Sequence, residues 1–253
     1  MIKLENAVFP SSEQMAFIIQ GMRNPMNSWH MSDSMIWKGD EGEEIDILLG
    51  EKDKKLMANL SRAGNEHRKY ARMMNAYVRI TAPLYWWKEF DTYKVGTVAN
   101  SCSTMHKITE HKFTIADFSI DHLDDNIGCH EVDPGDIMFS WKETSLDIMY
   151  NVIEALNVWR EKYLEAIKKE DNGEMNSKDI WWQLIQLLPS SYNQTRNVCI
   201  TYEALINMYT QRYAHKLDEW RKFCKWIETV PYFEEVIKPA LPEFLKLVSG
   251  AVF

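Results

Sequence analysis

Apolar residues recur at helical spacing along most of the chain. The clearest stripe covers residues 201–228 in steps of three and four, which predicts one long, central helix. The same criterion predicts helices over residues 51–62, 145–168 and 177–188, the last two separated by the breaker DNGEMN. The pattern therefore predicts a chain dominated by helices.

The first part of the chain carries signals for individual element boundaries. Ser11 and Gln14 have the spacing of a capping box, so a helix is predicted to begin there and to end before Pro25. Residues 76–81 alternate and are rich in β-branched and aromatic side chains, which predicts a strand. Pro83 ends this strand and suits the first turn of the following segment, LYWWKEFDTY, which is predicted to be helical.

The remaining segments complete the fold prediction. Residues 39–44 resemble a polar turn, and residues 233–248 are predicted to be helical with interruptions at Pro239 and Pro242. There is no internal repeat and no linker rich in proline or glycine. We therefore expect an α+β fold, a helix-rich single domain over residues 1–253 with a small mixed or antiparallel sheet.

Composition narrows the function classes. The net charge of −8 argues against a non-specific nucleic-acid binder, although a few local cations could still hold one nucleotide. The first ten residues lack the apolar core of a signal peptide, and no apolar run reaches the roughly 18 to 20 residues of a membrane span. The four cysteines are widely spaced and form no C-x-x-C pair, which favours free thiols and a cytoplasmic location.

Two other kinds of site have weak sequence support. Residues 121–131 are rich in Asp, His, Cys and Glu but lack the close pairs of a zinc site, so we predict no metal. His106 and His111 are interpreted as loop residues, and no neighbour in sequence would activate Cys102 as a nucleophile. The pairs Trp86-Trp87 and Trp181-Trp182 are interpreted as core or subunit-interface aromatics.

The segment from Ala82 to Thr97 resembles the signature of flavin-dependent thymidylate synthases. In that family a strand ends in Ala-Pro and enters a helix with Arg-Gln-Trp/Phe, followed by an Arg-His-Arg triplet and a loop of small residues. Here Ala82-Pro83 match, Lys88-Glu89-Phe90 stand for Arg-Gln-aromatic, and Thr92-Tyr93-Lys94 occupy the triplet. Residues 97–105 occupy the loop.

A second block supports the resemblance. Asn207 and Arg212 follow Pro189 at the offsets of the family's asparagine and nucleotide-binding arginine, and residues 63–67 resemble its glycine–histidine segment. The similar region covers about residues 52–227. Two features differ: the triplet keeps only its last cation, Lys94, and the arginine of the loop is missing.

The resemblance implies a homotetramer with active sites at subunit interfaces. It also implies FAD as redox carrier, dUMP or a related pyrimidine nucleotide as acceptor, and methylene-tetrahydrofolate and NADPH as co-substrates. In such a reaction the protein mainly binds and orients, so no protein nucleophile is needed. No catalytic residue is therefore assigned.

Candidate binding residues follow from the matched positions. The predicted nucleotide-binding residues are Arg212, Lys94, Cys102, Ser103 and Thr104. The predicted cofactor-binding residues are Asn207, Tyr93, Thr92, Lys88, Asn100 and Arg72. Each has a structural alternative: Arg212 could pair with Asp218, Glu219 or another helix, Tyr93 could be a core aromatic, and the lysines could be solvated.

Three functions are compatible with the sequence. The first is flavin-dependent reductive methylation of a pyrimidine nucleotide. The second, motivated by the altered triplet and loop, is a homologue that binds or sequesters a nucleotide without methyl transfer. The third is a helical module whose aromatic stripe binds a protein partner.

Overall fold

The fold is described from a computed structural model of the 253-residue chain. The structure describes residues 1–37, 46–132, 141–170 and 175–248. The turn predicted at residues 39–44 and most of the breaker DNGEMN lie outside these ranges. Contacts group the chain into two compact units: Met1, 82–87 and 101–195 form unit 1, whereas 2–81, 88–100 and 196–253 form unit 2.

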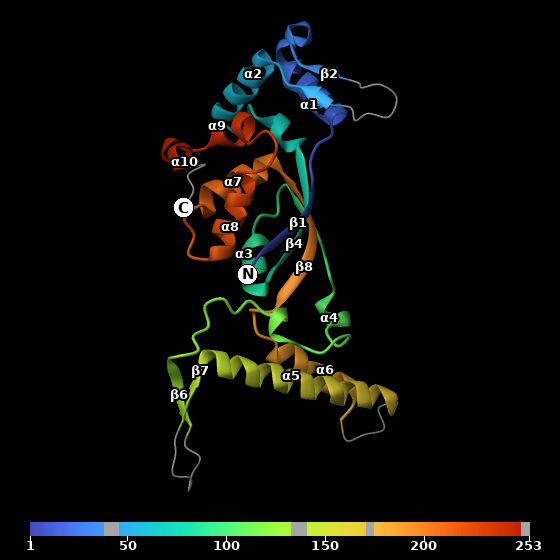
Figure 1. Cartoon of the computed structure of the whole chain (residues 1–253). Helices are drawn as coiled ribbons and strands as arrows, with labels where there is room; N and C mark the ends of the chain where they lie inside the picture. Colours follow the sequence, from blue (N-terminus) through green and yellow to red (C-terminus); the bar gives the residue numbers. More distant parts are fainter. Residues whose placement is uncertain (38–45, 133–140, 171–174, 249–253) are drawn as a thin grey trace. The chain divides into compact units, whose positions relative to one another are not determined.

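A four-stranded sheet carries the order β1-β4-β8-β5 (Figure 1). Its strands are β1 (Lys3–Val8), β4 (Asn75–Pro83), β5 (Thr97–Ser101) and β8 (Asn193–Thr201). β1 pairs antiparallel with β4, and a register shift follows Glu5, where Asn6 has a φ of 52°. The predicted α+β class with a small antiparallel sheet is confirmed.

Strand β4 alternates as the sequence predicts. Val78 and Ile80 are buried, whereas Tyr77 and Arg79, which alternate with them, are exposed, so one face of the strand belongs to the core of unit 2. Figure 1 shows α7 (Tyr202–Arg212) and α8 (Asp218–Ile227) beside this sheet.

Unit 2 also contains the amino-terminal and carboxy-terminal helices. They are α1 (Ser12–Arg23), α2 (Glu51–Arg62), α9 (Lys238–Ala240) and α10 (Glu243–Val248), with short helical turns at Asn24–Met26, Trp29–Met31, Lys69–Arg72 and Phe233–Ile237. The small hairpin of β2 (Met35–Trp37) and β3 (Asp46–Leu48) belongs to the same unit. The capping box predicted at Ser11 and Gln14 is confirmed, with both of its hydrogen bonds formed.

Two buried ion pairs tie elements of unit 2 together. Arg23 of α1 lies 2.6 Å from Asp53 of α2, and their side chains are 5% and 0% exposed. Arg68 pairs with Glu203 of α7, and these side chains are 8% and 10% exposed. Both pairs link segments far apart in sequence.

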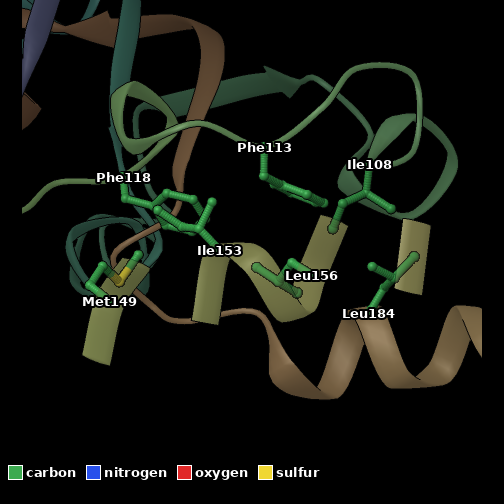
Figure 2. Close-up of a cluster of buried hydrophobic side chains, with 7 residues drawn as sticks. All are labelled: Ile108, Phe113, Phe118, Met149, Ile153, Leu156 and Leu184. Carbon is green, nitrogen blue, oxygen red and sulfur yellow. The ribbon is translucent and has the colours of Figure 1, made fainter. Parts of the chain in front are cut away.

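Unit 1 is built on two long helices. They are α5 (Ser145–Lys168) and α6 (Ser177–Leu187), accompanied by α4 (Thr104–Lys107), the turn Ile115–Asp117 and the hairpin of β6 (Gly128–Val132) and β7 (Trp141–Thr144). Figure 2 shows the core of this unit, where side chains from α5 and α6 meet the segment after α4. The buried members are Ile108, Phe113, Phe118, Met149, Ile153, Leu156 and Leu184.

Helix α3 (Leu84–Phe90) follows β4 directly, as the Ala82-Pro83 pattern predicts. Trp86 and Trp87 are 0% and 1% exposed, which confirms their interpretation as core residues. Trp182, in contrast, is 42% exposed, so it is not a core residue of this chain. Among the described residues, no helix combines the length and apolar content needed to cross a membrane.

Candidate functional site

Arg212, the last residue of α7, lies among polar and aromatic side chains of unit 2. Its Nε donates to the Tyr93 hydroxyl at 2.8 Å, and its Nη1 donates to Oε2 of Glu89 at 2.8 Å. The guanidinium carbon lies 5.6 Å from the centre of the Tyr93 ring and 5.0 Å from that of Trp220. Both distances are within the range of cation–π attraction, so two rings and one carboxylate hold the guanidinium.

Glu89, near the end of α3, has further contacts besides the hydrogen bond from Arg212. The same oxygen, Oε2, accepts from the indole Nε1 of Trp220 at 2.8 Å and lies 3.3 Å from Nε2 of His215. Trp220 is itself fully buried, with its ring packed against Phe90 and Phe223. We call these five residues, Glu89, Tyr93, Arg212, His215 and Trp220, the Arg212 cluster.

A helix break places the cluster. The sequence pattern predicts a single helix over residues 201–228, and this prediction is wrong: α7 ends at Arg212 and α8 begins at Asp218. Nδ1 of His215 accepts from the backbone N–H of Leu217, the residue before α8, and so holds the turn. Both helices bury apolar faces, so the apolar spacing continues through the break and hides it.

The break had one signal in the sequence. Asp218 and Glu219 lie in the first turn of α8, where acidic side chains interact favourably with the helix dipole. Three members of the cluster were not predicted as binding residues: Glu89, His215 and Trp220. Only contacts between distant segments reveal them.

Arg212 forms an ion pair with another helix, which is one of the structural alternatives predicted for it. Its partner is Glu89 of α3, whereas Asp218 pairs with Arg221 within α8. The Arg212 and Glu89 side chains are 20% and 34% exposed, so solvent reaches the pair. Burial raises the pKa of the Tyr93 hydroxyl, and the hydrogen bond from Arg212 partly offsets this effect. Tyr93 therefore stays a neutral donor, and its proton is directed to Gln211 at 2.8 Å.

The other predicted residues of unit 2 do not join this cluster. Thr92 donates to the carbonyl of Glu89 at 2.7 Å, a bond that closes the end of α3. Lys88 and Lys94 are exposed, and neither ammonium has a partner among the described residues. Arg72 bonds the carbonyl of Asn65.

Two asparagines predicted to bind the cofactor also lie in unit 2. Asn100 is exposed on β5. Asn207 is half-buried in α7, and within the described parts of the chain its amide has no hydrogen-bond partner. An amide in this state has both donors and an acceptor available for a ligand.

Cys102, Ser103 and Thr104 belong to unit 1 and are used locally. The Ser103 hydroxyl accepts from the backbone N–H of His106 at the start of α4. Gln194 donates to the Cys102 carbonyl and to the Thr104 hydroxyl, both at 2.9 Å. The prediction of a loop over residues 97–105 is wrong in part, because this segment contains β5 and the start of α4. His106, interpreted from the sequence as a loop residue, also lies in α4. The role of Cys102, Ser103 and Thr104 in nucleotide binding stays a prediction.

Metal binding has no support in the described part of the chain, where no three His, Cys, Asp or Glu side chains come together. The side chains of Cys129, His130 and Glu131 are outside that part. Cys102, Cys199 and Cys224 are free thiols, and burial raises the pKa of Cys224 to about 12. A buried neutral thiol of this kind is a packing residue.

Solved structures of other proteins share the fold of this chain. A crystal structure of the flavin-dependent thymidylate synthase ThyX from Helicobacter pylori, complexed with FAD and dUMP, matches with a TM-score of 0.51 and 16% identity over 98% of this chain and 97% of the other. The UMP/dUMP methylase PolB from Streptomyces cacaoi, bound with 5-Br dUMP, matches with a TM-score of 0.52 and 14% identity over 93% of this chain and 91% of its own. The fold is that of the flavin-dependent thymidylate synthases. The resemblance seen in the sequence therefore extends to a ThyX-like fold over nearly the whole chain. No protein-family model matches the sequence, and no curated protein matches it either.

Proposed function

We propose that this protein binds a pyrimidine nucleotide through Arg212 and methylates it reductively with FAD. The observation that supports the proposal most is the guanidinium of Arg212, which is partly exposed and lies beside two aromatic rings in a ThyX-like fold. A guanidinium binds phosphate or carbonyl oxygens at two points, and aromatic rings beside it suit a planar base. The two similar structures contain dUMP and 5-Br dUMP.

Unit 2 offers polar and cationic side chains of the types that bind a flavin cofactor. The amide of Asn207 suits the polar edge of an isoalloxazine, and Lys88 and Lys94 offer ammonium groups for the phosphates; none of the three has a partner among the residues that the structure describes. When bound, a reduced flavin supplies the hydride, and the protein supplies binding and orientation. Methylene-tetrahydrofolate as carbon donor, NADPH as reductant and a cytoplasmic homotetramer complete the proposal.

Activity is tested by incubating the protein with dUMP, FAD, NADPH and methylene-tetrahydrofolate and following dTMP by mass spectrometry. Turnover that requires dUMP, NADPH and methylene-tetrahydrofolate supports the proposal. The purified protein is also expected to carry a flavin absorbance band and to release FAD when denatured. A colourless protein that takes up no added FAD and forms no dTMP would rule out the flavin-dependent reaction.

A second candidate is nucleotide binding without methyl transfer. It is favoured by the triplet position, where Thr92 closes α3 and Tyr93 is bonded to Arg212 and Gln211, so neither side chain is free for a cofactor. Under this function dUMP stabilises the protein, by about 2.7 kcal/mol at 100 times its Kd, while no dTMP forms. Thermal unfolding with and without dUMP separates the two candidates when read together with the dTMP assay.

A further inference from the structure

Glu89 already occupies the position on Arg212 that an acidic ligand would take. Its Oε2 accepts from Arg212 Nη1 at 2.8 Å, which is the geometry of a carboxylate on a guanidinium. The other carboxylate oxygen, Oε1, has no hydrogen-bond partner among the described residues. The guanidinium charge is thus neutralised within the chain before any ligand arrives.

Glu89 is also the less mobile member of this pair. Its Oε2 accepts from Trp220 Nε1 at 2.8 Å, and Trp220 is fully buried against Phe90. Nε2 of His215 lies 3.3 Å from Glu89 Oε2 and 3.0 Å from Arg212 Nη1, so this imidazole contacts both members of the pair. The hydrogen bond from the buried Trp220 indole therefore holds the carboxylate whether or not Arg212 is present.

Arg212 is the partner that a ligand can draw away. Its side chain is 20% exposed, and its contacts with Tyr93 and Trp220 involve ring faces along which a guanidinium can turn. A neutral group such as a base carbonyl gains less from the guanidinium than the carboxylate already does. A phosphate monoester carries nearly two negative charges at neutral pH and gains more.

We propose that Glu89 is a resident competitor for Arg212 and a specificity-determining residue, which limits the site to ligands bearing a phosphate monoester. This inference rests on the proposed function, because it assumes that Arg212 is the group that the nucleotide reaches. It predicts that the wild-type protein binds dUMP and does not bind deoxyuridine, which lacks the phosphate.

The test compares the wild-type chain with Glu89→Gln, in which an amide oxygen can still accept from Trp220. Titration calorimetry is expected to show dUMP binding about tenfold tighter in the variant, the effect of one charge-assisted hydrogen bond. Glu51→Gln, which removes an exposed carboxylate of α2, is the matched control and should leave dUMP affinity unchanged. Equal or weaker dUMP binding by Glu89→Gln would overturn the inference and make Glu89 a positioning residue for Arg212.

A second arm uses inorganic phosphate and separates this inference from the nucleotide function. Phosphate is expected to raise the Tm of Glu89→Gln more than that of the wild type, and the gain should vanish in Glu89→Gln/Arg212→Ala. If phosphate gives these Tm shifts but no pyrimidine nucleotide binds, the proposed function is wrong and the competition of Glu89 for Arg212 is supported. If nucleotides bind through Arg212 but neither readout responds to Glu89→Gln, the competition fails alone. No response to either ligand in any variant contradicts both.

Discussion

Arg68 and Glu203 form a two-point ion pair across 135 residues of sequence. Nε of Arg68 lies 2.7 Å from Oε2 of Glu203, and Nη2 lies 3.1 Å from Oε1. The same guanidinium bonds the carbonyl of Ser61 and the side chain of Asn65. The pair joins the chain after α2 to the first turn of α7, the helix that ends in Arg212.

Removing the carboxylate of this pair should destabilise the protein strongly. Glu203→Ala leaves the buried Arg68 charge without its partner, and the expected loss is about 3–5 kcal/mol of the free energy of unfolding. Urea denaturation of both proteins at neutral pH measures the change. The double variant Arg68→Met/Glu203→Leu should recover much of the loss, because it removes both charges. A loss below about 1 kcal/mol for Glu203→Ala is the value for an exposed pair and would contradict the burial of this one.

The buried Asp53 predicts a pH-dependent contribution to stability. Burial alone would raise the pKa of Asp53, but hydrogen bonds from Ser32, Ser34 and Arg23 outweigh it and hold the pKa below its ordinary value. The folded form therefore favours the carboxylate. Its contribution is present above a pH of about 4, the unfolded pKa of Asp, and is lost as the pH falls through the folded pKa.

Asp53→Asn tests this contribution. The variant should lose about 3–5 kcal/mol at pH 7, and its difference from the wild type should shrink as the pH is lowered below about 4. Denaturant titrations over this pH range give the measurement. Asp91→Asn, which breaks an Asp–Arg pair whose carboxylate is 53% exposed, is the control and should cost at most about 1 kcal/mol. A difference between Asp53→Asn and the wild type that stays constant with pH would refute the lowered pKa.

Gly96 is predicted to be irreplaceable because of its surroundings. Its φ is 81°, and a Cβ added there would lie 2.4 Å from the Thr201 hydroxyl. Gly64 has a φ of 102° but no heavy atom within 4 Å of such a Cβ. Gly64→Ala thus carries only backbone strain, of about 1–3 kcal/mol, whereas Gly96→Ala carries the strain and the clash. Thermal unfolding should therefore show the larger loss for Gly96→Ala, and equal losses would mean that the Thr201 contact is unimportant.

The sequence predicts local elements well and long-range contacts poorly. The capping box at Ser11, the alternating strand β4 and the Pro83 transition into α3 depend on neighbouring residues, and all three are confirmed. The break between α7 and α8 depends on the hydrogen bond from Leu217 to His215 and on packing around Trp220, which the apolar spacing does not encode.

The candidate site shows the same limit. Arg212 and Tyr93 were selected at positions matched to a family signature, and the structure brings these two together. Glu89 is their neighbour only because α3 and α7 pack in space, so its role as partner of Arg212 could not be predicted from spacing along the chain. The sequence pattern identifies Arg212 as a residue type that binds anionic ligands. Only the three-dimensional contacts show that Glu89 already neutralises its charge.

The most direct test of the central claim, that Arg212 holds the nucleotide, is titration calorimetry of dUMP against the wild type and Arg212→Ala. The account predicts that the variant loses binding by about tenfold or more, because a charge-assisted contact to the phosphate is removed. Arg62→Ala, which removes an exposed arginine at the end of α2, should bind dUMP as the wild type does. Unchanged dUMP affinity in a folded Arg212→Ala protein would contradict the account.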